Sequence, residues 1–228
     1  MTLGLMQPCL LPYLSYFRLM KAVDVFIIAD DYQFTRSWIN RNNMLLHGKP
    51  FMFHLNLIGA SQNKMINEIY IDDQQPKTLK TIETAYKKAP FFSDIYPLMG
   101  KIFGYQEKNL SRFVGHSLLT IAEYLCLAPK FVYSSDIKVN NLHGAQEKII
   151  EYCSALNAQK YFQLYVEGLY EKEVFKRHGI DFYFLRSSKP IYYKQFKNEF
   201  VPTLSILDVL MFNSVEEINN NMLQYELF

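Results

Sequence analysis

Polar side chains crowd the segment from residue 30 to residue 42. The carboxylates of Asp30 and Asp31 can act as general bases, orient a sugar hydroxyl or hold a metal ion. The guanidinium groups of Arg36 and Arg41 can bind a phosphate through paired hydrogen bonds. Two structural interpretations compete with these roles: the aspartates can cap a turn after a strand, or form a partly buried salt bridge with the arginines.

The candidate site residues of the N-terminal region share a position at or just beyond the ends of expected strands and helices. In open α/β sheets, ligands bind at the carboxyl ends of the strands, so these positions favour a binding site. The residues are Gln7, Asp30, Asp31, Arg36, Trp38, Asn40, Arg41 and Asn42.

Other catalytic signals are weak. Cys9 follows an expected strand and could be a nucleophile, but a lone cysteine among prolines and leucines is more typical of a buried apolar residue. The five histidines show no metal-ligand spacing, so no metal site is predicted. The sequence contains no GxxxxGK[ST], GxGxxG, HExxH or GxSxG motif.

The elements that must position these residues begin with a strand at residues 3–6. Pro8 and Pro12 force a loop immediately after this strand. A helix over residues 13–22 and an apolar strand over residues 25–29 follow. Strand, helix and strand at this spacing predict a right-handed βαβ unit with parallel strands. A β-rich insertion over about residues 44–73 is expected to lie over the site, with a hairpin turning at residues 48–50 and a strand at residues 66–71.

Beyond the insertion, residues 77–127 are predicted to be helical, with a break at residues 89–92. Strands at residues 130–134, 161–166 and 180–185 then alternate with helices at residues 144–156, 170–178 and 204–211, with His143 at a helix start. The expected fold is therefore α/β, a mainly parallel, Rossmann-like sheet flanked by helices, in a single domain over residues 1–228.

Composition narrows the class of protein. Half of the 228 residues are apolar, and 17 Tyr and 18 Phe accompany a single Trp, which suits a chain with one substantial core. The net charge of +2 with interspersed signs argues against nucleic-acid binding. Three widely spaced cysteines, no signal peptide and no apolar run of about 20 residues predict a cytoplasmic protein without a transmembrane segment.

Motifs along nearly the whole chain resemble the WbqC-like protein family. They are Met6-Gln7-Pro8, Pro12 to Phe17, Asp24 to Phe26, Asp30-Asp31, Gln33-Phe34, Trp38 to Asn42, Ser61 to Lys64, Ile66 to Ile69, Tyr86 to Phe92, Tyr193 to Gln195 and Leu204 to Leu210. The family is associated with bacterial O-antigen and other surface-polysaccharide (lipopolysaccharide) clusters. The resemblance implies a transferase that modifies an amino-sugar nucleotide, and we add as a hypothesis N-acylation by an amino acid such as glycine.

The resemblance also implies site residues, which fall into two groups. The catalytic candidates are Asp30, Asp31 and Arg41. The substrate-binding candidates are Gln7, Pro8, Tyr13, Tyr16, Gln33, Trp38, Asn40, Asn42, Tyr86, Lys87, Tyr193, Gln195, Ser205 and Asp208.

The first strand, proline-rich loop, helix and second strand also resemble the start of the nucleotidylyltransferase-like superfamily. Its His-x-Gly-His signature is missing, since Pro12 to Tyr16 occupy that place. Another cation would then stabilise phosphate or oxyanion charge, and Arg41 and Lys87 are the candidates. The cofactor stays open among ATP, acetyl-CoA and a metal.

Three classes of function remain open from the sequence. The first is the sugar-modifying transferase, with a nucleotide-linked sugar as partner and the aromatic rings of Tyr13, Trp38 and Tyr193 stacking on sugar or base. The second is a metal-dependent glycosyltransferase that uses Asp30 and Asp31 to hold the ion. The third is a non-catalytic sugar-nucleotide binder or assembly protein. A homo-oligomer is among the oligomeric states that the sequence allows.

Overall fold

A six-stranded sheet forms the centre of the computed structural model, which describes residues 1–72, 75–139, 144–168, 170–196 and 199–228. Neighbouring strands run parallel, except that the strand at residues 225–227 is antiparallel to the strand at residues 181–187. The predicted α/β fold with a mainly parallel sheet is therefore confirmed. In spatial order the strands are β10 (Tyr225–Leu227), β9 (Asp181–Ser187), β8 (Lys160–Leu164), β1 (Thr2–Met6), β2 (Val25–Ile28) and β7 (Lys130–Tyr133).

The strand order reverses direction at β1. The chain proceeds outward from β1 to β2 and β7, then crosses to the other side of β1 and adds β8 and β9. This is the Rossmann-like order, in which ligands bind outside the carboxyl ends of the strands near the reversal point. The loop that leaves β1 therefore emerges where such a site is expected.

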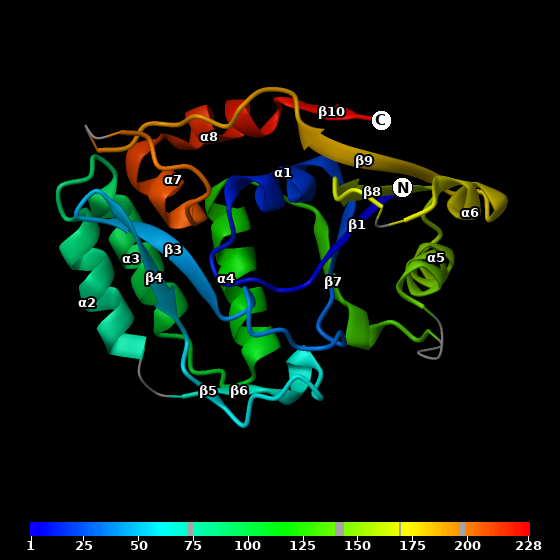
Figure 1. Ribbon diagram of the computed structural model, residues 1–228, viewed down its shortest axis with the longest axis horizontal. Helices are drawn as coiled ribbons and strands as arrows, with labels where there is room; N and C mark the ends of the chain where they lie inside the picture. Colours follow the sequence, from blue (N-terminus) through cyan, green and yellow to red (C-terminus); the bar gives the residue numbers. More distant parts are fainter. Residues whose placement is uncertain (73–74, 140–143, 169, 197–198) are drawn as a thin grey trace.

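Helices cover both faces of the sheet because side chains alternate between the faces along each strand. Phe26 and Ile28 of β2 belong to the larger core, whereas Ile27 and Ala29 belong to the smaller one. The larger core includes α1 (Leu14–Ala22), α3 (Phe92–Phe103), α4 (Leu110–Tyr124) and α7 (Ile206–Phe212), and the smaller one includes α5 (Ala145–Ala155) and α6 (Lys172–Arg177). Figure 1 shows α5 and α6 at one end of the molecule and α2 (Gln75–Tyr86) and α3 at the other.

The packing of α1 against the sheet depends on a glycine. A Cβ atom built on Gly4 of β1 would lie 3.1 Å from Val23 Cγ1 and 3.3 Å from Leu19 Cγ. The absence of a side chain on Gly4 thus allows close approach of α1 to β1. The proline-rich loop between them is held in place by these two closely packed elements.

The β-rich insertion is present, with different boundaries from those predicted. β3 (Arg41–Leu46) and β4 (Lys49–His54) form a hairpin, and β5 (Leu57–Ile58) pairs with β6 (Tyr70–Ile71). The turn is His47-Gly48, both at positive φ, rather than residues 48–50, since a two-residue turn of this hand matches the strand twist. Much of the strand expected at residues 66–71 is a 3₁₀ turn (Ile66–Glu68), and residue 73 lies outside the described residues.

The C-terminal region holds elements that the sequence reasoning missed. α8 (Val215–Met222) and β10 follow α7, where only a polar tail was expected. A Ser214–Glu217 capping box begins α8, and this pattern is readable from the sequence. The helix-start residue His143 lies outside the described residues. None of the helices in the described part of the chain is long and apolar enough to cross a membrane.

Candidate functional site

The two acidic residues after β2 form an internal network. Asp30 is fully buried and accepts hydrogen bonds from the Ser134 hydroxyl (3.1 Å), the Ser135 backbone N–H (3.0 Å) and the Ser135 hydroxyl (2.8 Å). Asp31 pairs with Lys148 Nζ at 2.7 Å, and its Oδ1 lies within hydrogen-bond distance of the same Ser134 hydroxyl, whose single proton is shared between the two aspartates. These contacts tie the carboxyl ends of β2 and β7 to α5, and both aspartates have their carboxylate oxygens engaged.

Lys148 is a member of this network that the sequence reasoning missed. It is 8% exposed, and its ammonium lies 4.6 Å from the centre of the Tyr32 ring. Burial raises the pKa of the Tyr32 phenol, and the nearby charge of Asp31 adds to that effect. Lys148 lies four residues before Tyr152 in a predicted helix, so the two share a helix face, and the lysine ammonium lies 5.9 Å from the centre of the Tyr152 ring. This spacing was the available signal in the sequence.

A pocket of about 270 Å³ lies beside the loop that leaves β1. The guanidinium of Arg41, at the start of β3, lines this pocket and is half-buried. Among the described residues, no hydrogen-bond partner reaches its buried Nε atom. The pocket is lined by Met6, Cys9, Pro12, Tyr13, Tyr16, Ser37, Trp38, Arg41, Asn42, Asn43, Met52 and Thr203. A cation without a partner in a pocket of this kind can bind an anion.

Asn42 holds one wall of this pocket, called the smaller pocket below, in place. Its side-chain amide donates to the backbone oxygens of Leu10 (3.2 Å) and Leu11 (2.8 Å). Leu11 adopts a φ of 42°, in the left-handed region that non-glycine residues rarely occupy. Cys9 is also part of the wall: burial raises the pKa of its thiol to about 12, so it is held as a neutral thiol rather than a thiolate nucleophile.

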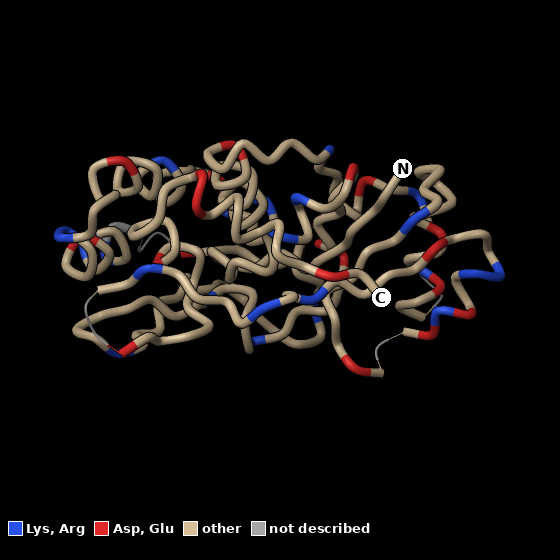
Figure 2. The backbone as a smooth tube through the Cα atoms, turned by 90° about the horizontal axis from the view of Figure 1, so that it is seen from above, with Lys and Arg blue, Asp and Glu red and all other residues tan. Residues whose placement is uncertain are grey.

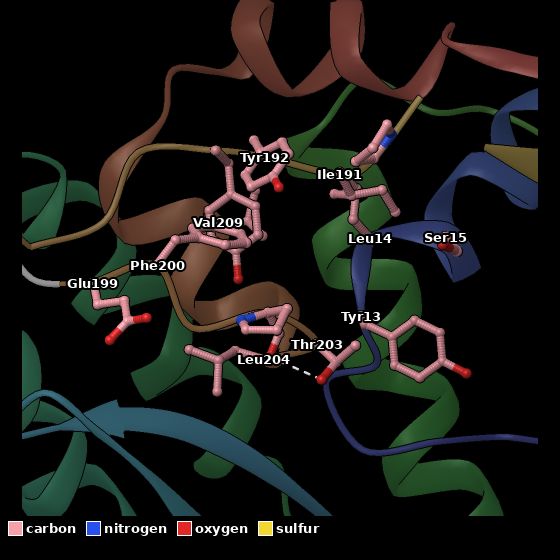
Figure 3. A pocket seen from close by; sticks show the side chains of 13 residues that line it. Tyr13, Leu14, Ser15, Ile191, Tyr192, Glu199, Phe200, Thr203, Leu204 and Val209 are labelled. Carbon is pink, nitrogen blue, oxygen red and sulfur yellow. Dashed lines mark hydrogen bonds between the residues drawn. The ribbon is translucent and has the colours of Figure 1, made fainter. Parts of the chain in front are cut away.

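A larger pocket of about 610 Å³ adjoins the smaller one, and the two share Tyr13 and Thr203 (Figure 3). The N-terminus of α1 and the segments 190–193 and 199–204 form its walls, and Glu199 and Tyr13 lie on opposite sides of it in Figure 3. Thr203 has a φ of 56°, and a β-branched residue in that region stores backbone strain. The sequence carried no readable signal for this conformation.

A buried polar cluster lies behind the larger pocket. The Tyr86 hydroxyl donates to Asp208 Oδ1 at 2.9 Å, and no donor among the described residues reaches Asp208 Oδ2. Burial raises the pKa of Asp208 to about 6, while Tyr86, Gln195 and Tyr193 favour its charged form. Burial and the charge of Asp208 raise the pKa of the Tyr193 phenol. Ser205 caps α7 and donates to Leu11 O at 2.7 Å, which connects this cluster to the loop after β1.

Most of the remaining predicted residues use their polar groups within the fold. Gln33 and Asn40 donate to the backbone oxygens of Gln62 (2.7 Å) and Leu55 (2.8 Å). Gln195 donates to the backbone oxygen of Val201 (2.8 Å), and Tyr16 to that of Gln7 (2.9 Å).

The structure thus divides the predicted site. Pro8 is buried, and Lys87 is exposed after the end of α2. Tyr13, Tyr16, Trp38, Arg41 and Asn42 line the smaller pocket, and Tyr13 and Tyr193 line the larger one. Asp30, Asp31 and Lys87 are not among the residues that line either pocket.

Comparison with known proteins identifies relatives of the whole chain. The sequence model of the WbqC-like protein family matches residues 7–220. The chain is similar to a Mycobacterium tuberculosis protein described as uncharacterized protein Rv1507c, with 29% identity over 213 residues, covering 91% of each chain. No solved structure matches the chain significantly.

Proposed function

The chain belongs to the WbqC-like protein family, and from this premise we propose that it is a transferase that modifies an amino-sugar nucleotide in O-antigen or other surface-polysaccharide biosynthesis. The proposed reaction forms an amide bond between the amine of the sugar and an acyl or aminoacyl group, such as glycyl. It breaks the bond between that group and its activating carrier, the thiol of coenzyme A or a phosphate derived from ATP, which leaves. In this proposal the smaller pocket receives the diphosphate of the nucleotide sugar.

The observation that carries the proposal is the state of Arg41. Its guanidinium is half-buried, its Nε atom has no partner in the described part of the chain, and it faces a pocket beside the carboxyl end of β1. A buried donor without a partner costs free energy, and the positive charge of Arg41 at the pocket favours an anion there. Phosphate oxygens suit the fork of N–H groups on arginine.

The rest of the smaller pocket fits the other parts of a nucleotide sugar. Trp38 and Tyr13 supply aromatic rings, and Tyr13 is 48% exposed, so its face is accessible for stacking on a base or sugar. Ser37 and Asn43 add exposed hydrogen-bonding groups at the same pocket. Such a mixture of aromatic and amide groups is typical of sites that bind sugars or nucleotides.

For Asp30 and Asp31, the contacts favour a positioning role within this proposal. Each carboxylate is already hydrogen-bonded or paired with Lys148, so its oxygens are engaged by groups of the fold rather than directed at a substrate. A glycosyltransferase would instead use the two acids to hold a metal ion. The Lys148 ammonium at 2.7 Å from Asp31 Oδ2 takes the position of such a cation, so the contacts favour the acyl or aminoacyl transferase.

The first prediction concerns binding of an amino-sugar nucleotide. Thermal unfolding of the purified protein, measured with UDP- and dTDP-amino sugars, should show stabilisation of about 2.7 kcal/mol at a hundred times the dissociation constant. Arg41→Ala should weaken binding by roughly tenfold or more, because a hydrogen bond to a charged group contributes about 1.5–3 kcal/mol.

Two variants serve as controls for that experiment. Arg36→Ala removes an exposed guanidinium that binds Ala60 O at 3.3 Å and lines neither pocket, and Lys87→Ala removes an exposed ammonium. Both should bind the nucleotide as the parent does. Equal affinity in Arg41→Ala and the parent would contradict the proposed anion site. Formation of an acylated sugar is measured by mass spectrometry, with glycine and ATP or with acetyl-CoA as the second substrate. Binding of the nucleotide without formation of this product would instead support a non-catalytic binding protein.

A further inference from the structure

The two adjoining pockets differ in charge. Arg41 lines the smaller pocket, whereas Glu199 is the charged residue among those that line the larger pocket in the described part of the chain. An anion is attracted by the first and repelled by the second. The phosphate groups of a substrate therefore belong in the smaller pocket, and the larger one suits an uncharged group.

The lining of the larger pocket is mainly hydrocarbon. Its walls are formed by Leu14, Pro190, Ile191, Tyr192, Tyr193, Phe200, Pro202, Leu204 and Val209, with Tyr13, Ser15, Glu199 and Thr203. The Thr203 hydroxyl is already bonded to Pro202 O at 2.8 Å, and the Tyr193 hydroxyl is buried near Asp208. The hydrogen-bonding side chains that remain among the described lining residues are Ser15, Glu199 and the exposed Tyr13 and Tyr192. A sugar in the hydrocarbon part of the pocket would lose contacts between its hydroxyls and water.

The aromatic rings at this pocket are also poorly arranged for a nucleobase. Phe200 packs against Tyr192 at a centroid distance of 5.0 Å and an angle of 52°, and against Tyr193 at 5.2 Å and 79°. Rings that pack edge-on or tilted against one another leave no parallel pair of faces between which a base could stack. Their apolar surface remains available to a flexible hydrocarbon group.

We propose that the larger pocket binds the uncharged hydrocarbon chain of an acyl group, carried by the second substrate of the enzyme. Its volume of about 610 Å³ is typical of ligand sites. Because the two pockets share Tyr13 and Thr203, the acyl chain and the nucleotide sugar would meet at these residues. The proposal rests on the proposed function in calling the ligand a second substrate, and it favours an acyl group with a chain over the glycyl group.

The second prediction tests the pocket with neutral straight-chain alcohols, from 1-butanol to 1-octanol, by calorimetric titration of the full chain. Each added methylene should lower the dissociation constant about fourfold, the ratio that corresponds to about 0.8 kcal/mol per buried CH₂. Octanoate, which carries a negative charge, should bind more weakly than octanol, and Glu199→Gln should narrow that difference.

A pocket-filling substitution supplies the matched control. Ile191→Trp places a large ring in the larger pocket and should weaken octanol binding at least tenfold, whereas Ile58→Trp, at an exposed position of β5, should leave it unchanged. Affinity that does not rise with chain length, or uridine that competes with octanol, would overturn the proposal. Octanol binding should survive Arg41→Ala, so failure of the nucleotide site and failure of the acyl pocket give different results.

Discussion

At the scale of single residues, unpaired buried polar groups occur both at the candidate site and elsewhere in the described part of the chain. The side-chain amides of Gln33, Asn40 and Gln195 donate hydrogen bonds to backbone oxygens of neighbouring segments, as most polar side chains in folded proteins do. Arg41 Nε and Asp208 Oδ2 have no such partner among the described residues. Arg18 Nε and Nη1 and the hydroxyls of Tyr32 and Tyr152, which line neither pocket, are in the same state. Buried groups in this state lower stability, and Arg41 differs from these in lining a pocket.

The third prediction follows from the raised pKa of Asp208, which burial moves to about 6. The folded state then binds this proton more tightly than the unfolded state, whose aspartate has a pKa near 4. The stabilising contribution of protonated Asp208 to the free energy of unfolding is therefore fully present below about pH 4, and it is lost as the pH rises to about 6. Asp208→Asn should remove this loss and raise the free energy of unfolding at pH 7 by up to about 3 kcal/mol.

Urea unfolding at pH 4, 5, 6 and 7 checks that prediction. The comparison variant is Tyr86→Phe, which deletes the hydroxyl that donates to Asp208 at 2.9 Å but keeps the buried carboxyl. It should retain the fall in stability with pH, whereas Asp208→Asn should flatten it. The same slope in Asp208→Asn and the parent would show that this group titrates normally.

At the scale of elements, the β1–loop–α1 unit determines where the smaller pocket lies. Gly4 lets α1 approach β1, and the loop between them is bonded from both sides, by Asn42 of β3 and by Ser205 and the Ile206 N–H at the start of α7. The pocket is thus built on a strand, a helix and a hairpin whose mutual positions depend on that close contact.

The fourth prediction compares two glycines. Gly4→Ala would bring Cβ to 3.1 Å from Val23 Cγ1 between two packed elements, and should lower the free energy of unfolding by about 1–3 kcal/mol. Gly100→Ala, inside α3, meets nothing within 4 Å and should raise it by about 0.5–1 kcal/mol. Denaturant unfolding measures both. Equal effects of the two substitutions would contradict the role given to the β1–α1 contact.

At the scale of the whole molecule, acidic and basic residues are interspersed along the backbone (Figure 2), in keeping with the net charge of +2. The pockets draw their walls from distant parts of the chain: the β1 loop, the β3–β4 hairpin, and the segments 190–193 and 199–204. Because these segments belong to different elements, ligands in either pocket should stabilise the native arrangement of the whole chain.

The fifth prediction is that the two pockets can be filled at once. Since the pockets share only Tyr13 and Thr203 among their lining residues, an amino-sugar nucleotide and octanol should raise the free energy of unfolding by nearly the sum of their separate effects. Thermal unfolding with each ligand alone and with both measures this sum. Stabilisation no larger than that from the better ligand would mean that both compete for one pocket.

The local pattern of the sequence was sufficient for most strands, most helices and the presence of the hairpin, because apolar periodicity, prolines and glycines act over a few residues. Four of the residues named as candidates from the sequence, Tyr13, Trp38, Arg41 and Asn42, line one pocket, since the β1 loop and β3 lie near each other in the chain.

Only the tertiary structure decided which of these polar groups are free. Asp31 is paired with Lys148, 117 positions away, and Asp30 with Ser134, 104 positions away, whereas Arg41 keeps an unpaired Nε among the described residues. The walls of the larger pocket likewise come from the segments 190–193 and 199–204 and from the start of α1. Contacts at such separations depend on the order of strands in the sheet and on the packing of its helices, and no short sequence pattern encodes either.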